Sequence, residues 1–299
     1  FTRITGLPPL PLLPVFKLLD EDGPLVGVRR GRLRLASLND YLLARLGARE
    51  LVTDPSTGAA TGLFDARRGR PSEALLRVAG VRAECLFAVA SATSNAGKLA
   101  PSAARTVGLP AGTPLFVGGA DQACAALGGG ASVGGSAVVS LGTAGTVLRP
   151  IARFTVPSAG LFSLPHVVPG QWVLEAFTAG LGSAIELAAS RLGLAGPRDL
   201  DEAARRAATG GHEPADAQAA AALDELGAGI GRAVEAVGAR APVTNLVAVG
   251  GAARSDPLLE SVARRAGKLV ERGRELQAAS LGAARLALAG AGLSGSLGG

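Results

Sequence analysis

The sequence contains no methionine, and its first residue is Phe1. Because gene products begin with Met, we expect Phe1 to follow a segment that this chain lacks. Aromatic residues are also scarce, at 3% of 299 residues, with one tryptophan (Trp172) and one tyrosine (Tyr41). A core of this composition must be built from Ala, Val and Leu. Few aromatic rings are present to stack on bases, which argues against binding of single-stranded nucleic acid.

Cysteine and histidine each occur twice, as Cys85, Cys124, His166 and His212. Two cysteines exclude a disulfide framework, and their spacing is not that of a metal site. Two histidines exclude a His-rich metal site. The sequence has no apolar run of 18 residues and no signal-peptide pattern, so neither a membrane helix nor a secretory signal is predicted. These absences predict a cytoplasmic protein with no membrane partner.

The net charge is +6, from 30 basic and 24 acidic side chains. A basic balance is typical of nucleic-acid-binding proteins when the charge is clustered. Here the arginines are spread along the chain and often adjoin acids, as in residues 65–68 and 201–206. We therefore predict no nucleic-acid partner. Hydrophobic residues make up 48% of the chain, which is enough for a folded core.

Strand and helix patterns alternate along the chain, which predicts an α/β fold. Short apolar runs bounded by Gly or Pro predict strands, and the pair around residues 142–145 predicts a hairpin. Serine caps and glycine stops delimit helices, as at Ser37 and Gly47. Strands are expected at 113–117, 136–141, 146–148, 245–249 and 268–270. Helices are expected at 37–46, 71–78, 101–107, 122–127, 177–192, 199–238 (interrupted at 210–214), 256–266 and 276–289, with a frayed tail after 290.

Three glycine-rich turns follow predicted strands, at residues 118–121, 142–146 and 250–253. In open α/β sheets, ligands bind at the carboxyl ends of the strands. Glycine there lets backbone N–H groups approach an anion closely. Three such turns in one chain favour a nucleotide cleft. None of them matches the P-loop or the dinucleotide-binding fingerprint, which argues against both of those classes.

Asp121 follows a predicted buried strand and two glycines, and it is the only acid between Leu115 and Ala152. Two interpretations remain open for it. Aspartate is a favoured helix N-cap. It also suits a general base, which would accept the proton of a substrate hydroxyl while that oxygen attacks phosphorus.

The motifs around Asp121 resemble those of the FGGY carbohydrate kinases, and xylulokinase-like members are the most similar. The resemblance extends in order over nearly the whole chain. It is carried by residues 40–43, 53–56, 61–65, 108–114, 118–122, 140–146, 249–252 and 278–284.

This resemblance implies an actin-like, ribonuclease-H-like ATPase fold with two domains, the first of them incomplete. Residues 1–132 would be the remnant of the FGGY N-terminal domain, on the substrate side, and residues 133–299 the C-terminal domain, on the nucleotide side. The implied enzyme is a phosphotransferase that uses ATP and Mg²⁺ to phosphorylate a sugar or polyol hydroxyl. A homodimer is a further expectation.

Matching the family motifs position by position assigns roles to individual residues. Asp121 would be the catalytic base and would contact the substrate together with Gln122. No residue is assigned to a metal. ATP-binding residues would be Gly142, Thr143, Gly180, Gly250, Gly251 and Ser255.

The sequence also departs from the family pattern. Family members are longer, and their Asp-x-Gly-Thr-Thr/Ser phosphate motif, whose Asp helps hold Mg²⁺, would lie before Phe1. An internal gap is expected between about Ala208 and Ala219, and Ala144 replaces the usual serine of the phosphate turn. These departures leave an alternative open, namely a truncated, catalytically silent relative that acts as a nucleotide-binding or interaction protein.

Overall fold

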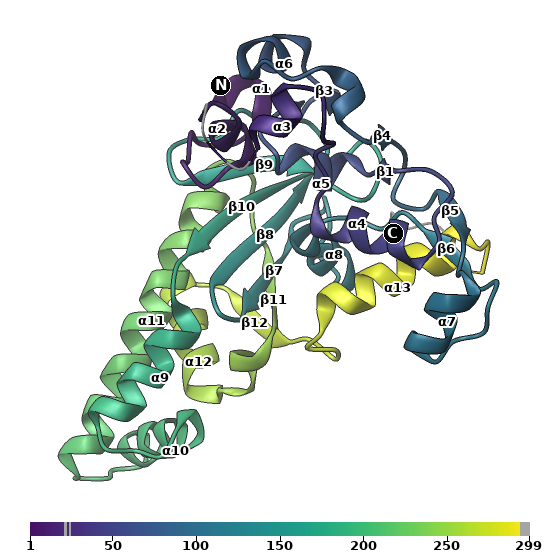
Figure 1. The fold of residues 1–299 in the computed structure, drawn as a ribbon. Helices are drawn as coiled ribbons and strands as arrows, with labels where there is room; N and C mark the ends of the chain where they lie inside the picture. The colour runs from purple at the N-terminus through teal and green to yellow at the C-terminus, as the bar shows by residue number, and fades with distance from the viewer. Residues whose placement is uncertain (21–22, 24, 294–299) are drawn as a thin grey trace. The chain divides into compact units, whose positions relative to one another are not determined.

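The computed structural model describes residues 1–20, 23 and 25–293, and the chain forms two compact units (Figure 1). Unit 1 comprises Phe1–Cys124, Ile151–Val173 and the residues from Gly282, and unit 2 comprises Ala125–Pro150 and Leu174–Leu281. The predicted division between residues 132 and 133 concerns the two domains of the family and stays a prediction. Most of the predicted tail lies outside the described residues.

Unit 1 consists mainly of short helices and two-stranded sheets, and its described residues include two apolar clusters. The larger cluster includes Leu18, Leu63 and Phe64, and the smaller one includes Leu43 and Val117. The elements are α1 (Thr2–Thr5), α2 (Pro14–Leu18), α3 (Val26–Arg29), α4 (Leu38–Leu46), β1 (Val52–Thr53), α5 (Pro55–Ala59), β2 (Phe64–Asp65), β3 (Arg70–Pro71), α6 (Glu73–Ala79), η1 (Ala83–Cys85), β4 (Ala88–Val89), β5 (Asn95–Lys98), α7 (Pro101–Val107), β6 (Pro114–Phe116) and β9 (Leu161–Pro165).

Local sequence signals delimit several of these helices. Ser37 and Asp40 form a capping box at the start of α4, in which each side chain accepts a hydrogen bond from the other residue's backbone N–H. Gly80 and Gly108 end α6 and α7 in the left-handed conformation that glycine adopts without strain. These predicted helices are confirmed to within about two residues.

Unit 2 is built on a sheet with the strand order β12-β11-β7-β8-β10. The predicted hairpin is confirmed, because β7 pairs antiparallel with β8. β11 lies parallel to both β7 and β12. The strands are β7 (Ser136–Leu141), β8 (Gly145–Ile151), β10 (Trp172–Thr178), β11 (Asn245–Val249) and β12 (Leu269–Arg272).

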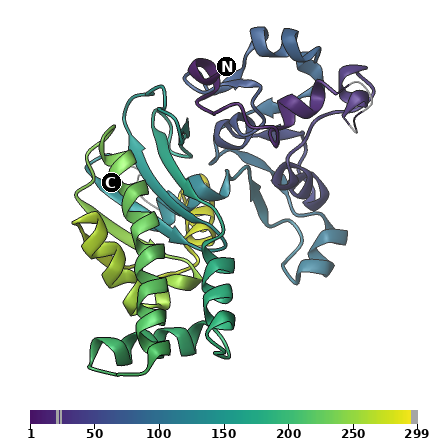
Figure 2. The same cartoon turned by 90° about the vertical axis from the view of Figure 1, so that its left-hand side faces the viewer.

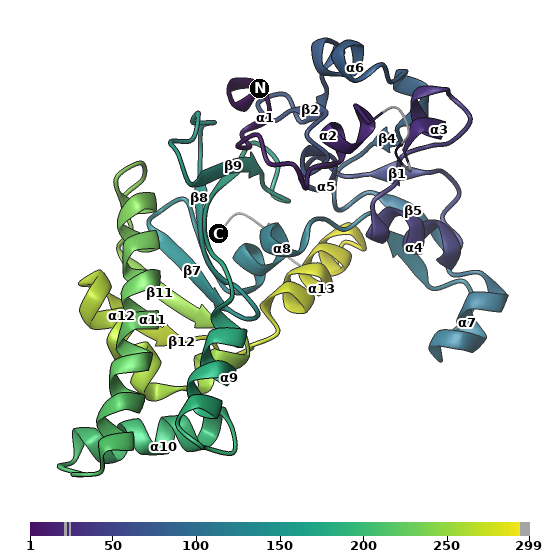
Figure 3. The same ribbon diagram turned by 60° about the vertical axis from the view of Figure 1, so that its left-hand side comes forward.

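Four helices complete unit 2, and Figures 2 and 3 show α11 and α12 along one face of the sheet. Glycines bring these two helices close together, since a Cβ on Gly227 would lie 2.2 Å from Ser261 Oγ. Arg206 near the end of α10 forms an ion pair with Asp216 near the start of α11, with 2.8 Å between a guanidinium nitrogen and Oδ1. The helices are α9 (Leu181–Arg191), α10 (Pro197–Ala208), α11 (Pro214–Gly238) and α12 (Asp256–Ala266), with the short η2 (Gly251–Arg254) before α12.

Two helices contain residues of both units, α8 (Asp121–Gly128) and α13 (Ala278–Gly290). Within unit 1 they approach closely, because a Cβ on Gly282 would lie 1.9 Å from the carbonyl oxygen of Cys124. No helix of the described ranges is long and apolar enough to cross a membrane.

One predicted boundary is wrong. The helix expected from Phe177 begins only at Leu181, because β10 continues to Thr178. Gly180 then takes a left-handed conformation, with φ 69°, and separates strand from helix. The β-favouring run Trp172–Thr178 is paired in the sheet, so its strand preference prevails over the helical pattern that follows.

Arg149 of β8 is a buried cation, 5% exposed, that the sequence pattern does not reveal. Its Nε donates to Pro242 O at 2.8 Å, and its other nitrogens donate to the carbonyls of Ser132, Val133 and Pro150. Burial lowers the pKa of this guanidinium. The Arg149 guanidinium therefore links β8 to two loops of unit 2, one with Ser132 and Val133 and the other with Pro242.

Replacing Arg149 by Lys is expected to lower the free energy of unfolding by about 1–2 kcal/mol, because one ammonium cannot reach all of these carbonyls. Urea denaturation of the variant measures the loss. Arg153→Lys is the matched control, since Arg153 is exposed. Equal stability of the two variants would contradict this role for Arg149.

Candidate functional site

The predicted phosphate and adenosine turns of unit 2 lie at one edge of its sheet. β7 and β11 are parallel neighbours with Val249 opposite Ser140, so their carboxyl ends coincide. Gly250 follows β11 with φ 90° and ψ 173°. A Cβ on it would lie 2.6 Å from Leu141 O. The two glycine turns therefore lie side by side, as expected at a ligand-binding strand edge.

The N-terminus of α9 meets the first of these turns. Gly182 N donates to Thr143 O at 3.2 Å, and a Cβ on Gly182 would lie 3.3 Å from Gly142 O. Gly180 stands immediately before α9, and Thr143 is exposed. The positive end of the α9 helix dipole therefore lies beside the Gly142–Thr143 turn, and such a position is favourable for an anion.

A cavity of about 1000 Å³ begins at Gly251, the residue that follows Gly250, and lies between η2, α9 and α10. Gly251 and Ser255 line it, as does the apolar side chain of Ile185. Gly142, Thr143, Gly180 and Gly250 do not. A Cβ on Gly251 would have no neighbouring atom within 4 Å, so the wall is open at that residue. Charged side chains of both signs also line the cavity, namely Arg198, Asp199, Asp201, Glu202, Arg205 and Arg254.

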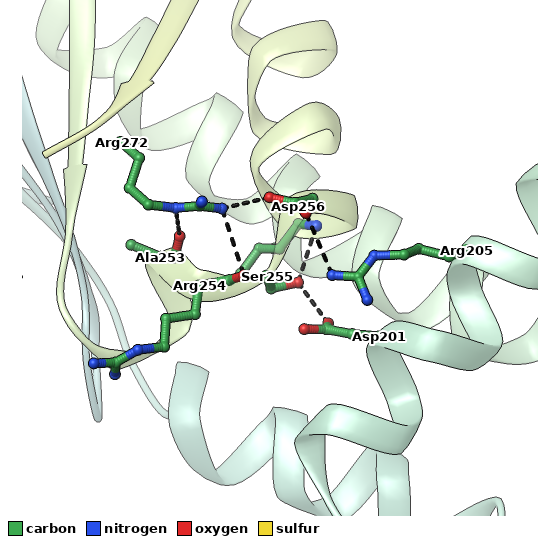
Figure 4. A network of polar contacts seen from close by, with 8 residues as sticks. Asp201, Arg205, Ala253, Arg254, Ser255, Asp256 and Arg272 are labelled. Atoms are coloured by element: carbon green, nitrogen blue, oxygen red, sulfur yellow. Dashed lines mark hydrogen bonds and ion pairs between the residues drawn. The ribbon is translucent and has the colours of Figure 1, made fainter.

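A polar network holds the η2 turn and the start of α12 (Figure 4). Ser255 Oγ donates to Asp201 Oδ1 at 2.6 Å and accepts from Leu258 N at 3.2 Å, so it caps α12 and ties it to α10. Arg272 of β12 donates through Nε to Ala253 O at 2.7 Å and also bonds Asp256.

Arg205 approaches the same Asp256 carboxylate at 3.4 Å. Arg272, and to a smaller extent Arg205, lower the pKa of Asp256. Burial raises the pKa of Asp201, and the hydrogen bond from Ser255 only partly offsets this increase. Asp201, which lines the cavity, therefore takes up a proton more readily than an ordinary aspartate, whereas Asp256, which follows the lining residue Ser255, stays anionic. Sequence reasoning missed Asp201, Asp256 and Arg272, because their contacts join segments about 16 to 54 residues apart.

In unit 1, Asp121 is the exposed first residue of α8. Its Oδ1 accepts a hydrogen bond from Gln122 N at 2.8 Å. The side chain is thus accessible to a ligand and stands in the first turn of a helix, where a carboxylate is favoured. Gln122 is half-buried, and its Oε1 has no hydrogen-bond partner among the described residues.

Two buried residues support the turn that carries Asp121. Ser56 Oγ accepts from Ala120 N at 2.9 Å and donates to Asp54 Oδ2 at 2.6 Å. Asp54 also caps α5 by accepting from the backbone N–H groups of Ser56 and Thr57. The Asp-Pro-Ser pattern is typical of such a cap. The hydrogen bond from Ala120 N to Ser56 Oγ, 64 residues away, is not visible in the sequence.

Gly119 permits the close packing of this turn. A Cβ there would lie 2.2 Å from Val167 Cγ1 and 3.0 Å from Ser56 Oγ. No group of three or more His, Cys, Asp or Glu side chains that could hold a metal ion occurs within the described part of the chain. The described residues therefore do not form a protein-only site for Mg²⁺.

His166 follows β9 and is 6% exposed. Its Nδ1 accepts from Val168 N at 2.8 Å, and its Nε2 is buried without a partner among the described residues. Burial lowers the pKa of His166 to about 4. The imidazole is therefore neutral in the folded chain at pH 7.

This lowered pKa predicts a pH-dependent stability. Between the ordinary pKa of about 6.5 and the folded value of about 4, the unfolded chain binds a proton that the folded chain does not, so stability falls as the pH falls. The expected loss between pH 7 and pH 5 is about 2 kcal/mol. Urea denaturation at the two pH values measures it.

His166→Asn is the variant to compare, because its amide oxygen can accept from Val168 N and does not titrate. We expect the stability of this variant to lose about 2 kcal/mol less than that of the unsubstituted chain over the same range. An equal loss in both proteins would contradict the buried, neutral histidine.

Part of the chain is similar in sequence to known carbohydrate kinases. Residues 3–128 match the model of the FGGY family of carbohydrate kinases, N-terminal domain. The autoinducer-2 kinase of Klebsiella pneumoniae is 34% identical over 204 residues, which cover 62% of this chain and 37% of that protein. The chain thus spans under two fifths of the length of this curated relative. The predicted resemblance to the FGGY kinases is confirmed, and it includes a match of residues 3–128 to the N-terminal domain of that family.

Solved structures bear on the fold. The ligand-bound xylulose kinase of Lactobacillus acidophilus superposes with a TM-score of 0.86 at 20% identity, over 99% of this chain and 66% of that one. The glycerol kinase of Plasmodium falciparum with ADP gives a TM-score of 0.83 at 16% identity, with the same coverage. The predicted actin-like, ribonuclease-H-like fold is confirmed. The more specific resemblance to xylulokinases stays a prediction.

Proposed function

We propose that the chain contributes to an ATP-dependent carbohydrate kinase, in which unit 2 binds the nucleotide and Asp121 of unit 1 acts on the acceptor hydroxyl. The observation that carries the proposal is the strand edge of unit 2, where Gly142, Thr143 and Gly250 converge at the carboxyl ends of β7 and β11. The match of residues 3–128 to the N-terminal domain of the FGGY family of carbohydrate kinases supports a carbohydrate as the acceptor.

The residues of unit 2 fit a nucleotide in both size and chemistry. The phosphates would lie at the Gly142–Thr143 turn, near the N-terminus of α9, where backbone N–H groups and the helix dipole stabilise negative charge. The adenosine would occupy the cavity lined by Gly251 and Ser255, whose volume of about 1000 Å³ is within the range of ligand sites. Gly180 would flank the phosphates. ATP supplies the phosphoryl group when it is bound.

Asp121 would accept the proton of the substrate hydroxyl, and the Gln122 amide would bind a neighbouring hydroxyl. The bonds from Asp54 to Ser56 and from Ser56 to Ala120 would fix the carboxylate in position. Positioning of this kind is a large part of catalysis in phosphoryl transfer.

Calorimetric titration with ATP tests the nucleotide site. Gly251→Leu fills the open wall of the cavity, so ATP binding should be lost while the chain stays folded. Gly238→Leu is the control, because Gly238 is also surrounded by open space but does not line the cavity. ATP binding that survives Gly251→Leu would place the nucleotide elsewhere.

The acceptor side is tested separately, with a coupled assay of ADP release over a panel of pentuloses and polyols. Turnover with one of them supports the kinase. ATP binding without turnover of any acceptor would instead favour the alternative, a catalytically silent nucleotide-binding relative.

A further inference from the structure

The residue before Asp121 is held through both of its backbone groups. Ala120 N donates to Ser56 Oγ at 2.9 Å. Ala120 O accepts from Cys124 N, also at 2.9 Å, in the first hydrogen bond of α8. The position of Asp121 therefore depends on Cys124 as well as on Ser56.

Cys124 makes a second contact with the turn that carries Asp121. Its Sγ donates to Gly119 O at 3.6 Å, and the residue is 2% exposed. Burial, together with the negative charge of Asp54, raises the pKa of the Cys124 thiol to about 12. The sulfur thus keeps its proton at neutral pH. Cys124 donates to both of the residues that directly precede Asp121.

Gly282 of α13 packs against the backbone of Cys124, and α13 runs beside α8 in Figures 1 and 3. A Cβ on Gly282 would lie 1.9 Å from Cys124 O and 2.7 Å from the carbonyl carbon. Real Cβ atoms do not come within 3.0 Å of a backbone atom, so this spacing of the helices requires glycine. Glycine inside a helix costs about 1 kcal/mol relative to alanine. The close approach therefore occurs at a position where alanine would favour the helix itself.

We propose that Gly282 is a positioning residue for the kinase reaction, because its contact with Cys124 determines where the first turn of α8 lies and how the Asp121 carboxylate is directed. The inference rests on the proposed function, in which Asp121 is the base. Gly282 itself touches neither the acceptor nor the nucleotide. The Asp121 turn is then supported by α13 through Gly282 and by α5 through Ser56.

Gly282→Ala tests the proposal. The new Cβ requires the helices to separate by about 1 Å, the difference between 1.9 Å and 3.0 Å. A misplacement of that size can lower the rate about 10²-fold, and we expect kcat to fall by this factor. The KM of the acceptor and the affinity for ATP should stay within about twofold of the original values, since only the reacting group is displaced. The coupled assay of ADP release and calorimetric titration with ATP measure the two effects.

Gly290→Ala is the matched control in the same helix. A Cβ on Gly290 would lie 2.4 Å from Thr93 O, so this substitution also creates a collision with a backbone carbonyl. The collision does not involve α8, and Gly290 is the last residue of α13. We expect kcat to be unchanged in this variant. Equal losses of kcat in Gly282→Ala and Gly290→Ala would overturn the proposal.

Cys124→Ala is a second test that introduces no collision, for use if Gly282→Ala does not fold. It removes the thiol donor to Gly119, so kcat should fall about threefold to tenfold, the effect of one neutral hydrogen bond. Cys124→Ser retains a donor at this position and should recover most of the loss. Full turnover of Cys124→Ala would contradict support of the Asp121 turn by Cys124.

NMR of ¹³C-labelled aspartate carboxyl groups reads the position of Asp121 without any substrate. The Asp121 resonance is assigned by its absence from Asp121→Asn. We expect it to shift in Gly282→Ala and in Cys124→Ala, and to stay in place in Gly290→Ala. An unchanged resonance in Gly282→Ala would overturn this proposal, whereas full turnover of Asp121→Asn would overturn the proposed function.

Discussion

Replacing Asp121 by Asn is expected to lower the turnover number of the kinase reaction by about 10²- to 10⁴-fold, the contribution typical of a positioned general base. Asparagine keeps the size of the side chain and the oxygen that accepts from Gln122 N, but it cannot take up the hydroxyl proton. Because Asp121 is exposed, the substitution should not disturb the core. The coupled assay of ADP release measures the effect with the best acceptor.

The matched control is Asp65→Asn. Asp65 is also an acid of unit 1 that accepts hydrogen bonds from backbone N–H groups, those of Arg67 and Arg68, and it belongs to neither proposed site. Its turnover should equal that of the unsubstituted chain. If Asp121→Asn retained full turnover, Asp121 would be only a structural residue at the start of α8.

The second large effect is expected at Gly250. Replacing it by Ala should lower the free energy of unfolding by about 3 kcal/mol, because φ 90° with ψ 173° is a conformation almost restricted to glycine. The new Cβ would also collide with the backbone of Leu141, whose oxygen would be 2.6 Å away. Relief of this collision would separate the ends of β7 and β11, so ATP binding should weaken as well.

Gly251→Ala is the neighbouring control. Gly251 has no positive φ, and a Cβ there has open space around it. Its unfolding free energy should stay within about 0.5 kcal/mol of the original value. Urea denaturation of both variants gives the comparison. Equal stability of the two would contradict the close approach of Gly250 to Leu141.

Local patterns in the sequence predicted the individual elements of unit 2 well. The strands at Ser136–Leu141 and Asn245–Val249 have the predicted bounds, because a short apolar run between glycines has few other stable conformations. β9 was not predicted, and neither was β10, whose strand bonds depend on distant partners. Trp172, at the start of β10, donates to Ala66 O, 106 residues away.

The sequence likewise predicted one part of the candidate site and missed another. The glycine turns at residues 142 and 250 were predicted as a ligand edge, since the ends of neighbouring parallel strands must meet. The sequence did not predict the polar residues that stabilise this edge. Asp201 and Arg272 contact the η2 turn from α10 and β12, and such tertiary hydrogen bonds have no periodicity in the sequence.

The proposed ATP site of unit 2 lies at the edge formed by β7, β11 and the N-terminus of α9. Hydrogen exchange followed by mass spectrometry, with and without ATP and Mg²⁺, tests it most directly. We expect slower exchange of the amides in residues 142–145, 180–184 and 250–255 when ATP is present. Unchanged exchange in all three segments at saturating ATP, or protection confined to other segments, would contradict it.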